Sequence, residues 1–144
     1  MANNTLQVTG RETIKWLPKT ASVAIAYGAI LAFDGSGGLT NASSSSKLFA
    51  GIARRVVAST DSDYASATLM PFVELKGDEE YEMDVYSGTA LTAAMVGNSY
   101  DLYDSSLLNV GGTTHKVVTV TGFISATRAR VKFNGAYVFL NAAA

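Results

Sequence analysis

The chain has 144 residues, a net charge of −1 and a hydrophobic fraction of 48%. This length suits one domain of ordinary size, and the absence of any run of 18 apolar residues argues against a transmembrane helix. With no cysteine and one histidine, the chain can form neither disulfides nor thiolate metal sites, and a His-rich metal site is disfavoured.

Charge is unevenly distributed along the chain. Residues 1–60 carry six Lys/Arg and two acids, residues 61–104 carry ten acids and one lysine, and residues 105–144 carry four Lys/Arg and no acid. Such a layout can pair strands within one fold or orient subunits against one another. Because no concentrated basic face is present, we expect no nucleic-acid partner, and we expect no membrane partner either.

Residues 1–20 differ from the rest of the chain. They are polar and lack a helical period, apart from an alternating apolar pair, Ile14 and Trp16. Pro18 ends that stretch because it has no N–H and favours an extended residue before it. We predict an extended N-terminal arm or edge strand over 1–20, followed by a single β-barrel-like domain over 21–144.

The middle of the chain predicts short strands separated by loops. Residues 27–33 are apolar and are followed by a glycine-rich turn, and residues 48–58 form a second candidate strand. Residues 69–86 predict a hairpin that turns around Lys76-Gly77-Asp78, with alternating apolar and acidic residues in its second strand. Residues 89–96 predict one short helix, capped by Ser87 or Thr89, or an extended connection.

The last third predicts several more short strands, and Asn134-Gly135 between two of them is a strong hairpin signal. Many short strands at close spacing are typical of a β-barrel or sandwich. We therefore predict an all-β fold: a compact barrel or sandwich of short antiparallel strands, with an extended N-terminal arm and at most one short helix. The sequence shows no internal repeat.

A row of acids is the first candidate for chemistry. Alternation places Glu80, Glu82 and Asp84 on one strand face, but the ligand spacing of a calcium-binding EF-hand is missing. Rows of carboxylates usually lie in water or against bases, so we expect them to face Arg128, Arg130 and Lys132 of the same chain or of a neighbouring subunit. We predict no metal and no cofactor.

The remaining candidates favour binding over catalysis. His115 follows a predicted turn, and no GxSxG motif or cysteine accompanies it. The adjacent Arg54 and Arg55 could grip a phosphate, but without a wider basic patch a salt bridge or subunit contact is favoured. Trp16 suits an interface anchor or a closing residue at one end of the barrel. We predict no catalytic residue and no enzymatic activity.

A family resemblance rests on the order of these features. The arm, the strand opening YGAIL, the segment KLFAGIARR, then MVGNSYDLYDSSLLNVGG and VVTVTGFISATRARVKFNG resemble small capsid decoration (cement) proteins of tailed bacteriophages over roughly residues 10–135. The resemblance implies a β-barrel-like domain on the outside of the phage head, commonly trimeric, whose terminal arm reaches onto the major capsid protein. It supplies no catalytic residues.

We accordingly predict a structural virion protein, made in the host cytoplasm, that binds the outer capsid surface and stabilises the shell. The predicted partners are the major capsid protein and further copies of the chain, three in all as the resemblance implies. The alternatives are a carbohydrate-binding β-domain and a head fibre-base or head–tail joining protein. The candidate partner-binding residues are Ile14, Trp16, Arg54, Arg55, Glu80, Glu82, Asp84, Arg128, Arg130 and Lys132.

Overall fold

The computed structural model describes residues 5–8 and 10–139. Its strands are β1 (Leu6–Gln7), β2 (Ile14–Pro18), β3 (Ile30–Phe33), β4 (Leu39–Asn41), β5 (Phe49–Ala53), β6 (Leu69–Glu74), β7 (Tyr81–Val85), β8 (Ser99–Leu102), β9 (Leu107–Asn109), β10 (Val118–Ser125) and β11 (Arg128–Phe133). Two 3₁₀ turns, η1 (Ala93–Met95) and η2 (Gly135–Tyr137), complete it. The predicted all-β class is therefore confirmed. No helix in the described ranges is long and apolar enough to cross a membrane.

Five strands in the second half of the chain form a closed barrel. Their order is β7-β11-β10-β8-β9, and a parallel pairing of β9 with β7 closes the ring. The strands alternate as a barrel requires: Tyr81, Met83 and Val85 of β7 are buried inside, while the residues between them are half-exposed. β1 adds to the edge of β7 through Leu6 opposite Glu82 and Gln7 opposite Tyr81.

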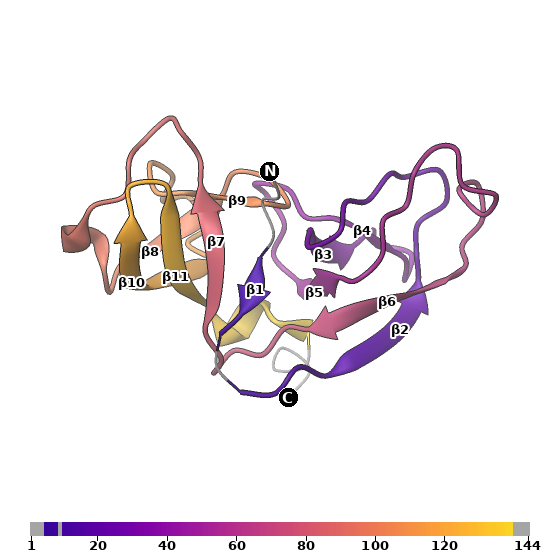
Figure 1. Ribbon diagram of the computed structural model, residues 1–144, viewed down its shortest axis with the longest axis horizontal. Helices are drawn as coiled ribbons and strands as arrows, with labels where there is room; N and C mark the ends of the chain where they lie inside the picture. Colours follow the sequence, from indigo (N-terminus) through magenta and orange to yellow (C-terminus); the bar gives the residue numbers. More distant parts are fainter. Residues whose placement is uncertain (1–4, 9, 140–144) are drawn as a thin grey trace.

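The first half of the chain forms a second antiparallel sheet in the order β2-β6-β5-β3-β4. An isolated parallel bridge between Lys19 and Leu39 joins the end of β2 to β4, so the first and last strands of this sheet meet. Figure 1 shows the barrel and this sheet as two lobes side by side, with β1 between them and the paired β2 and β6 along the lower margin.

The two halves share one topology. Taking the five strands of each half in chain order, both have the order 1-5-4-2-3 and both bring strands 1 and 3 together in parallel. The registers agree as well: Lys19 bridges Leu39 as Val85 pairs with Leu108, and Leu17 lies opposite Met70 as Met83 lies opposite Ala129. The fold therefore contains a repeat that the sequence does not reveal, because a barrel position demands only an apolar side chain of suitable size.

One hydrophobic core joins the two lobes. Phe133 of β11 makes edge contacts with Tyr81 of β7 and with Phe49 of β5, each with ring centroids 5.7 Å apart. All three residues are fully buried, and burial raises the pKa of the Tyr81 hydroxyl to about 12. A smaller core fills the second sheet on its other side, around Leu31, Met70 and neighbouring apolar residues.

The hairpin predicted over 69–86 is wrong. β6 pairs with β2 and β5, whereas β7 pairs with β1, β9 and β11, so the two strands belong to different sheets. The turn at 76–78 signals only a local reversal and does not choose the partner of a strand. Burial decides with which strands β6 and β7 pair. Val73 of β6 and Tyr81 of β7 lie in different sheets, and both contribute to the core that the two lobes share.

The Asn134-Gly135 hairpin and the helix over 89–96 are corrected too. Asn134 has φ −63°, whereas the two-residue turn needs positive φ, and its side-chain amide donates to the Lys116 carbonyl at 2.6 Å. Residues 135–137 form a 3₁₀ turn in place of a reversal. In the 89–96 segment only Ala93–Met95 are helical, and neither Ser87 nor Thr89 caps them, because Thr92 holds that position.

The division into an arm over 1–20 and one domain over 21–144 stays a prediction. Within the predicted arm, residues 14–18 form β2, an edge strand that pairs along its length with β6. Residues 1–4 and 9 lie outside the described residues.

Two buried charged residues hold loops in place. The Lys19 amine donates to the carbonyls of Asp63, Tyr64 and Ser66 at 2.5–3.1 Å, which fixes the loop between β5 and β6. On the barrel, the Asp101 carboxylate accepts the backbone N–H groups of Thr114, His115 and Lys116 at 2.6–3.1 Å. In both places a single buried side chain satisfies several backbone groups and so sets the conformation of a loop.

The Asp101 carboxylate is stabilised as an anion. Burial favours its neutral form, but the three backbone donors outweigh this effect and hold the pKa of Asp101 below its ordinary value. A lowered pKa in the folded state contributes stability above the ordinary pKa, which is lost as the pH falls through the lowered folded value.

We predict that Asp101→Asn lowers the free energy of unfolding at pH 7 by about 1–3 kcal/mol. The three backbone N–H groups would then donate to a neutral amide in place of a carboxylate, and such hydrogen bonds are weaker. Below about pH 4 the difference should shrink, because the carboxyl of the unfolded chain takes up a proton there while the native carboxylate still resists protonation. Urea denaturation at pH 7 and pH 3 measures both effects. The exposed Asp78→Asn is the matched control, and an equal loss in both variants would contradict the assignment.

Candidate partner-binding surface

An exposed apolar strip lies on one face of β2 and β6. Trp16 lies opposite Pro71 and Pro18 opposite Leu69, so these side chains share a face. Trp16 and Leu69 are each 58% exposed, and Ile14 at the start of β2 is 46% exposed. We call Ile14, Trp16, Leu69 and Pro71 the β2–β6 strip. Large apolar side chains gathered on one surface are typical of an interaction site.

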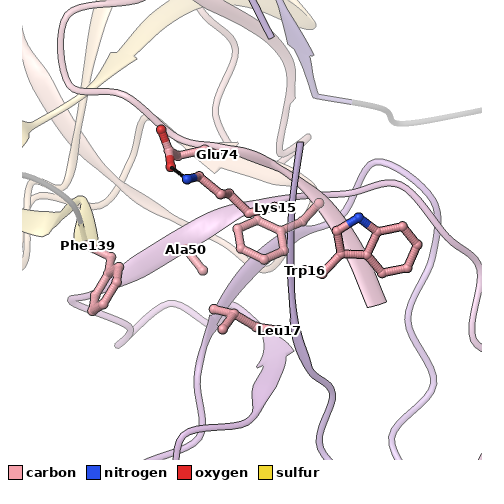
Figure 2. A pocket seen from close by; sticks show the side chains of 7 residues that line it. Lys15, Trp16, Leu17, Ala50, Glu74 and Phe139 are labelled. Carbon is pink, nitrogen blue, oxygen red and sulfur yellow. Dashed lines mark ion pairs between the residues drawn. The ribbon is translucent and has the colours of Figure 1, made fainter. Parts of the chain in front are cut away.

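A small cavity lies beside the strip. It measures about 190 Å³ and is lined by Lys15, Trp16, Leu17, Ala50, Phe72, Glu74 and Phe139. Figure 2 shows the Trp16 indole pointing away from the group formed by Leu17, Ala50 and Phe139. Lys15 reaches across to Glu74, with 3.9 Å between the ammonium nitrogen and the carboxylate oxygen. The cavity is mostly apolar with one ion pair at its rim.

The structure pairs both predicted arginines within the chain. The Arg54 guanidinium binds Glu12, donates to the Tyr27 hydroxyl at 2.6 Å and lies 5.6 Å from the centre of the Tyr27 ring. Arg55 binds both oxygens of Asp63 at 2.6 and 2.9 Å, and this guanidinium holds the pKa of Asp63 well below its usual range. Their role toward a partner stays a prediction.

The acidic row meets the basic strand, as expected, within one chain. Arg128 contacts Asp84 at 2.8 Å and Glu82 at 3.3 Å, and Arg130 contacts Glu82 at 3.5 Å. These pairs follow from the β7–β11 register, which places Glu82 opposite Arg130 and Asp84 opposite Arg128. Glu80 accepts the Val8 N–H through its backbone carbonyl, and Lys132 lies opposite Thr119 on β10.

The predicted site residues therefore fall into separate places. Ile14 and Trp16 lie on the β2–β6 strip, whereas the acidic and basic residues of β7 and β11 cover the barrel wall. Sequence reasoning missed Leu69 and Pro71, because nothing in the sequence shows that β6 lies beside β2. Within residues 5–8 and 10–139, no three His, Cys, Asp or Glu side chains are grouped so that they could hold a metal ion.

The ion pairs on the barrel wall should differ in strength. Arg128 bridges two acids and is less exposed than Arg130, so solvent screens its contacts less. We predict that Arg128→Met lowers the free energy of unfolding by about 1 kcal/mol and that Arg130→Met lowers it by roughly half as much or less. Denaturation at low and high salt measures both. Equal losses that do not respond to salt would count against these pairs.

Comparison with known proteins gives a fold relationship. No family model matches the chain, and no curated protein matches it. Among solved structures, the chain is similar to a chain of "The capsid of Myoviridae Phage XM1", with a TM-score of 0.52 and 12% sequence identity. The match covers 87% of this chain and 84% of that chain. At this identity the likeness concerns the fold: this chain has the fold of a phage capsid protein.

Proposed function

We propose that this chain is a structural protein of a phage virion, which binds the outside of the head as a decoration protein, stabilises the shell and acts as a trimer. The observation that carries the proposal is the fold match to a phage capsid chain over most of both molecules. Because the match covers both lobes, the likeness extends to the whole arrangement of barrel and second sheet. A match to a single barrel would carry less weight.

The surface of the molecule suits such a role. The β2–β6 strip exposes a tryptophan and two aliphatic side chains, and tryptophan is among the residues that contribute most to interface energetics. The ion pairs on β7 and β11 match those charges within one chain, so they need no partner. The major capsid protein is the partner that we assign to the strip.

We predict that Trp16→Ala weakens binding to phage heads by about tenfold or more, which corresponds to the loss of a hot-spot residue of roughly 1.4 kcal/mol or more. The melting temperature should change little, because Trp16 is 58% exposed. Co-sedimentation with heads stripped of the protein gives the affinity, and calorimetry gives the melting temperature. The control is Val96→Ala, an exposed apolar residue that directly follows η1. Undiminished binding by Trp16→Ala would refute the strip as the shell contact.

The trimer has its own test. Light scattering coupled to size-exclusion chromatography should give three times the 15.1 kDa chain mass for protein free of shells. If trimers form only on the shell, the free protein elutes as a monomer and cryo-electron microscopy of decorated heads shows three copies around an axis. Single, isolated copies on the head would contradict the trimer.

A further inference from the structure

The barrel closes through its shortest strand. β9 has three residues and lies between β7 and β8, to each of which it is joined by two residue pairs. Its pairing with β7 is parallel, and parallel pairs are slightly less stable per residue than antiparallel ones. We call β9 and its pairings with these two strands the β9 seam. Few backbone hydrogen bonds hold the barrel closed there.

Two tyrosine rings meet across this seam. Tyr86 directly follows β7, and Tyr103 directly follows β8. The preceding residues, Val85 and Leu102, are buried in the core, so the alternation of side chains directs both tyrosines to the outside of the barrel. Their ring centroids are 3.7 Å apart and their planes differ by 6°. The two side chains therefore connect the end of β7 with the end of β8.

The backbone imposes this stack. Aromatic rings prefer offset or edge-to-face contacts to a face-to-face sandwich, and a centroid distance of 3.7 Å leaves little offset. The Tyr86 N–H donates to the Leu108 carbonyl and the Tyr103 N–H to the Leu107 carbonyl, each at 2.8 Å, so β9 fixes both residues. Gly88 packs on the Tyr86 ring, since a Cβ atom there would lie 2.4 Å from a ring carbon.

The hydroxyl groups define the orientation of the two rings. The Tyr103 hydroxyl hydrogen-bonds to the Tyr86 side chain, and this bond raises the pKa of Tyr103 above its ordinary value. Because the hydroxyls lie at the same end of two nearly parallel rings, the ring carbons beside one hydroxyl face those beside the other. These ortho carbons share the unpaired electron when a tyrosine loses one electron and one proton.

We propose that Tyr86 and Tyr103 form an oxidative cross-linking site, at which a one-electron oxidant joins the two rings into a dityrosine. Each hydroxyl gives up one electron and one proton, which leaves two phenoxyl radicals. The radicals form a C–C bond between facing ortho carbons, and each of these carbons then passes its proton to the oxygen of its own ring. The chain loses two hydrogen atoms. With a peroxidase, one hydrogen peroxide takes them up and is reduced to two water molecules.

The cross-link closes the barrel covalently across the β9 seam. It encloses residues 87–102 in a loop, which restricts the unfolded chain as a disulfide of similar span does. Tyr103 is 43% exposed, so an oxidant reaches its ring, and the ring has room to turn as the new bond forms. The inference concerns the isolated chain and does not rest on the proposed function, so either can fail alone.

The first test treats dilute protein with a peroxidase and hydrogen peroxide. A denaturing gel then isolates the single 15.1 kDa chain, which excludes links between chains. Cleavage before aspartates separates residues 84–100 from residues 101–103. We expect these two peptides joined, lighter than their sum by two hydrogen atoms, with fragmentation placing the link at Tyr86. Absence of the joined peptide, or a link at the buried Tyr100 in its place, would overturn the proposal.

Two variants control for exposure. Tyr27 is 42% exposed, much like Tyr103, but its hydroxyl accepts a hydrogen bond from Arg54. We expect the joined peptide to be lost from Tyr103→Phe and unchanged in yield from Tyr27→Phe, because only the first change removes a stacked phenol. Circular dichroism verifies that both variants fold. Equal yields of the dityrosine signal from the single-chain band would contradict the assignment.

The melting temperature tests the effect on the seam. The cross-linked chain should melt roughly 5 °C or more above the untreated chain, since the closed loop lowers the entropy of the unfolded state. Tyr103→Phe treated in the same way measures any change caused by oxidation elsewhere. A cross-linked chain that melts no higher than this control would show that the link does not strengthen the seam, and would refute that part of the inference.

Discussion

The contact of Phe133 with both Tyr81 and Phe49 is the interaction on which the rest of the structure depends. It joins the barrel to the second sheet through one buried aromatic cluster, so neither lobe completes its core alone. The direct passage of the chain from β6 to β7 follows from this cluster: Val73 and Tyr81 stand on either side of the lobe boundary and both point into the same core. A hairpin between these strands would have placed them in one sheet and left that boundary empty.

Sequence patterns correctly predicted the features that depend on the local alternation of apolar and polar residues. The alternation of Tyr81, Met83 and Val85 with acids correctly identified the buried and exposed faces of β7. The charges predicted that the acids meet Arg128 and Arg130, but not whether these belong to the same chain or to a neighbouring subunit. The patterns failed where the partner of a strand is set at long range, as at β6 and β7. They also failed at Asn134, whose side chain bonds to Lys116, a residue distant in sequence. For the site, Trp16 and Ile14 could be found, but Leu69 could not.

Charge has two separate roles in this molecule. Carboxylates of the described residues pair with bases of the same chain, and at Asp63, Glu82 and Asp84 these pairs join strands and loops. Asp101 and Lys19 bind backbone groups in place of an opposite charge and so fix loops that contain no regular structure. The basic–acidic–basic layout of the sequence therefore reflects internal pairing to a large extent. What it leaves exposed on the second sheet is the neutral, apolar strip.

The two lobes show how one topology can carry two roles. In the barrel, β1 covers the edge of β7, and the acidic outer face of β7 is paired with arginines, so that surface is closed. In the second sheet β4 meets only the end of the corresponding strand, β2, and no strand of the described residues covers positions 14–17, whose outer face carries Trp16 and Ile14 in place of acids. Because the fold is repeated, the two halves of one molecule can be compared with each other. They differ most in strand pairing and polarity at this edge, and this is also where a partner would gain most from binding. Backbone groups and apolar side chains are exposed together there, and an added strand satisfies both at once.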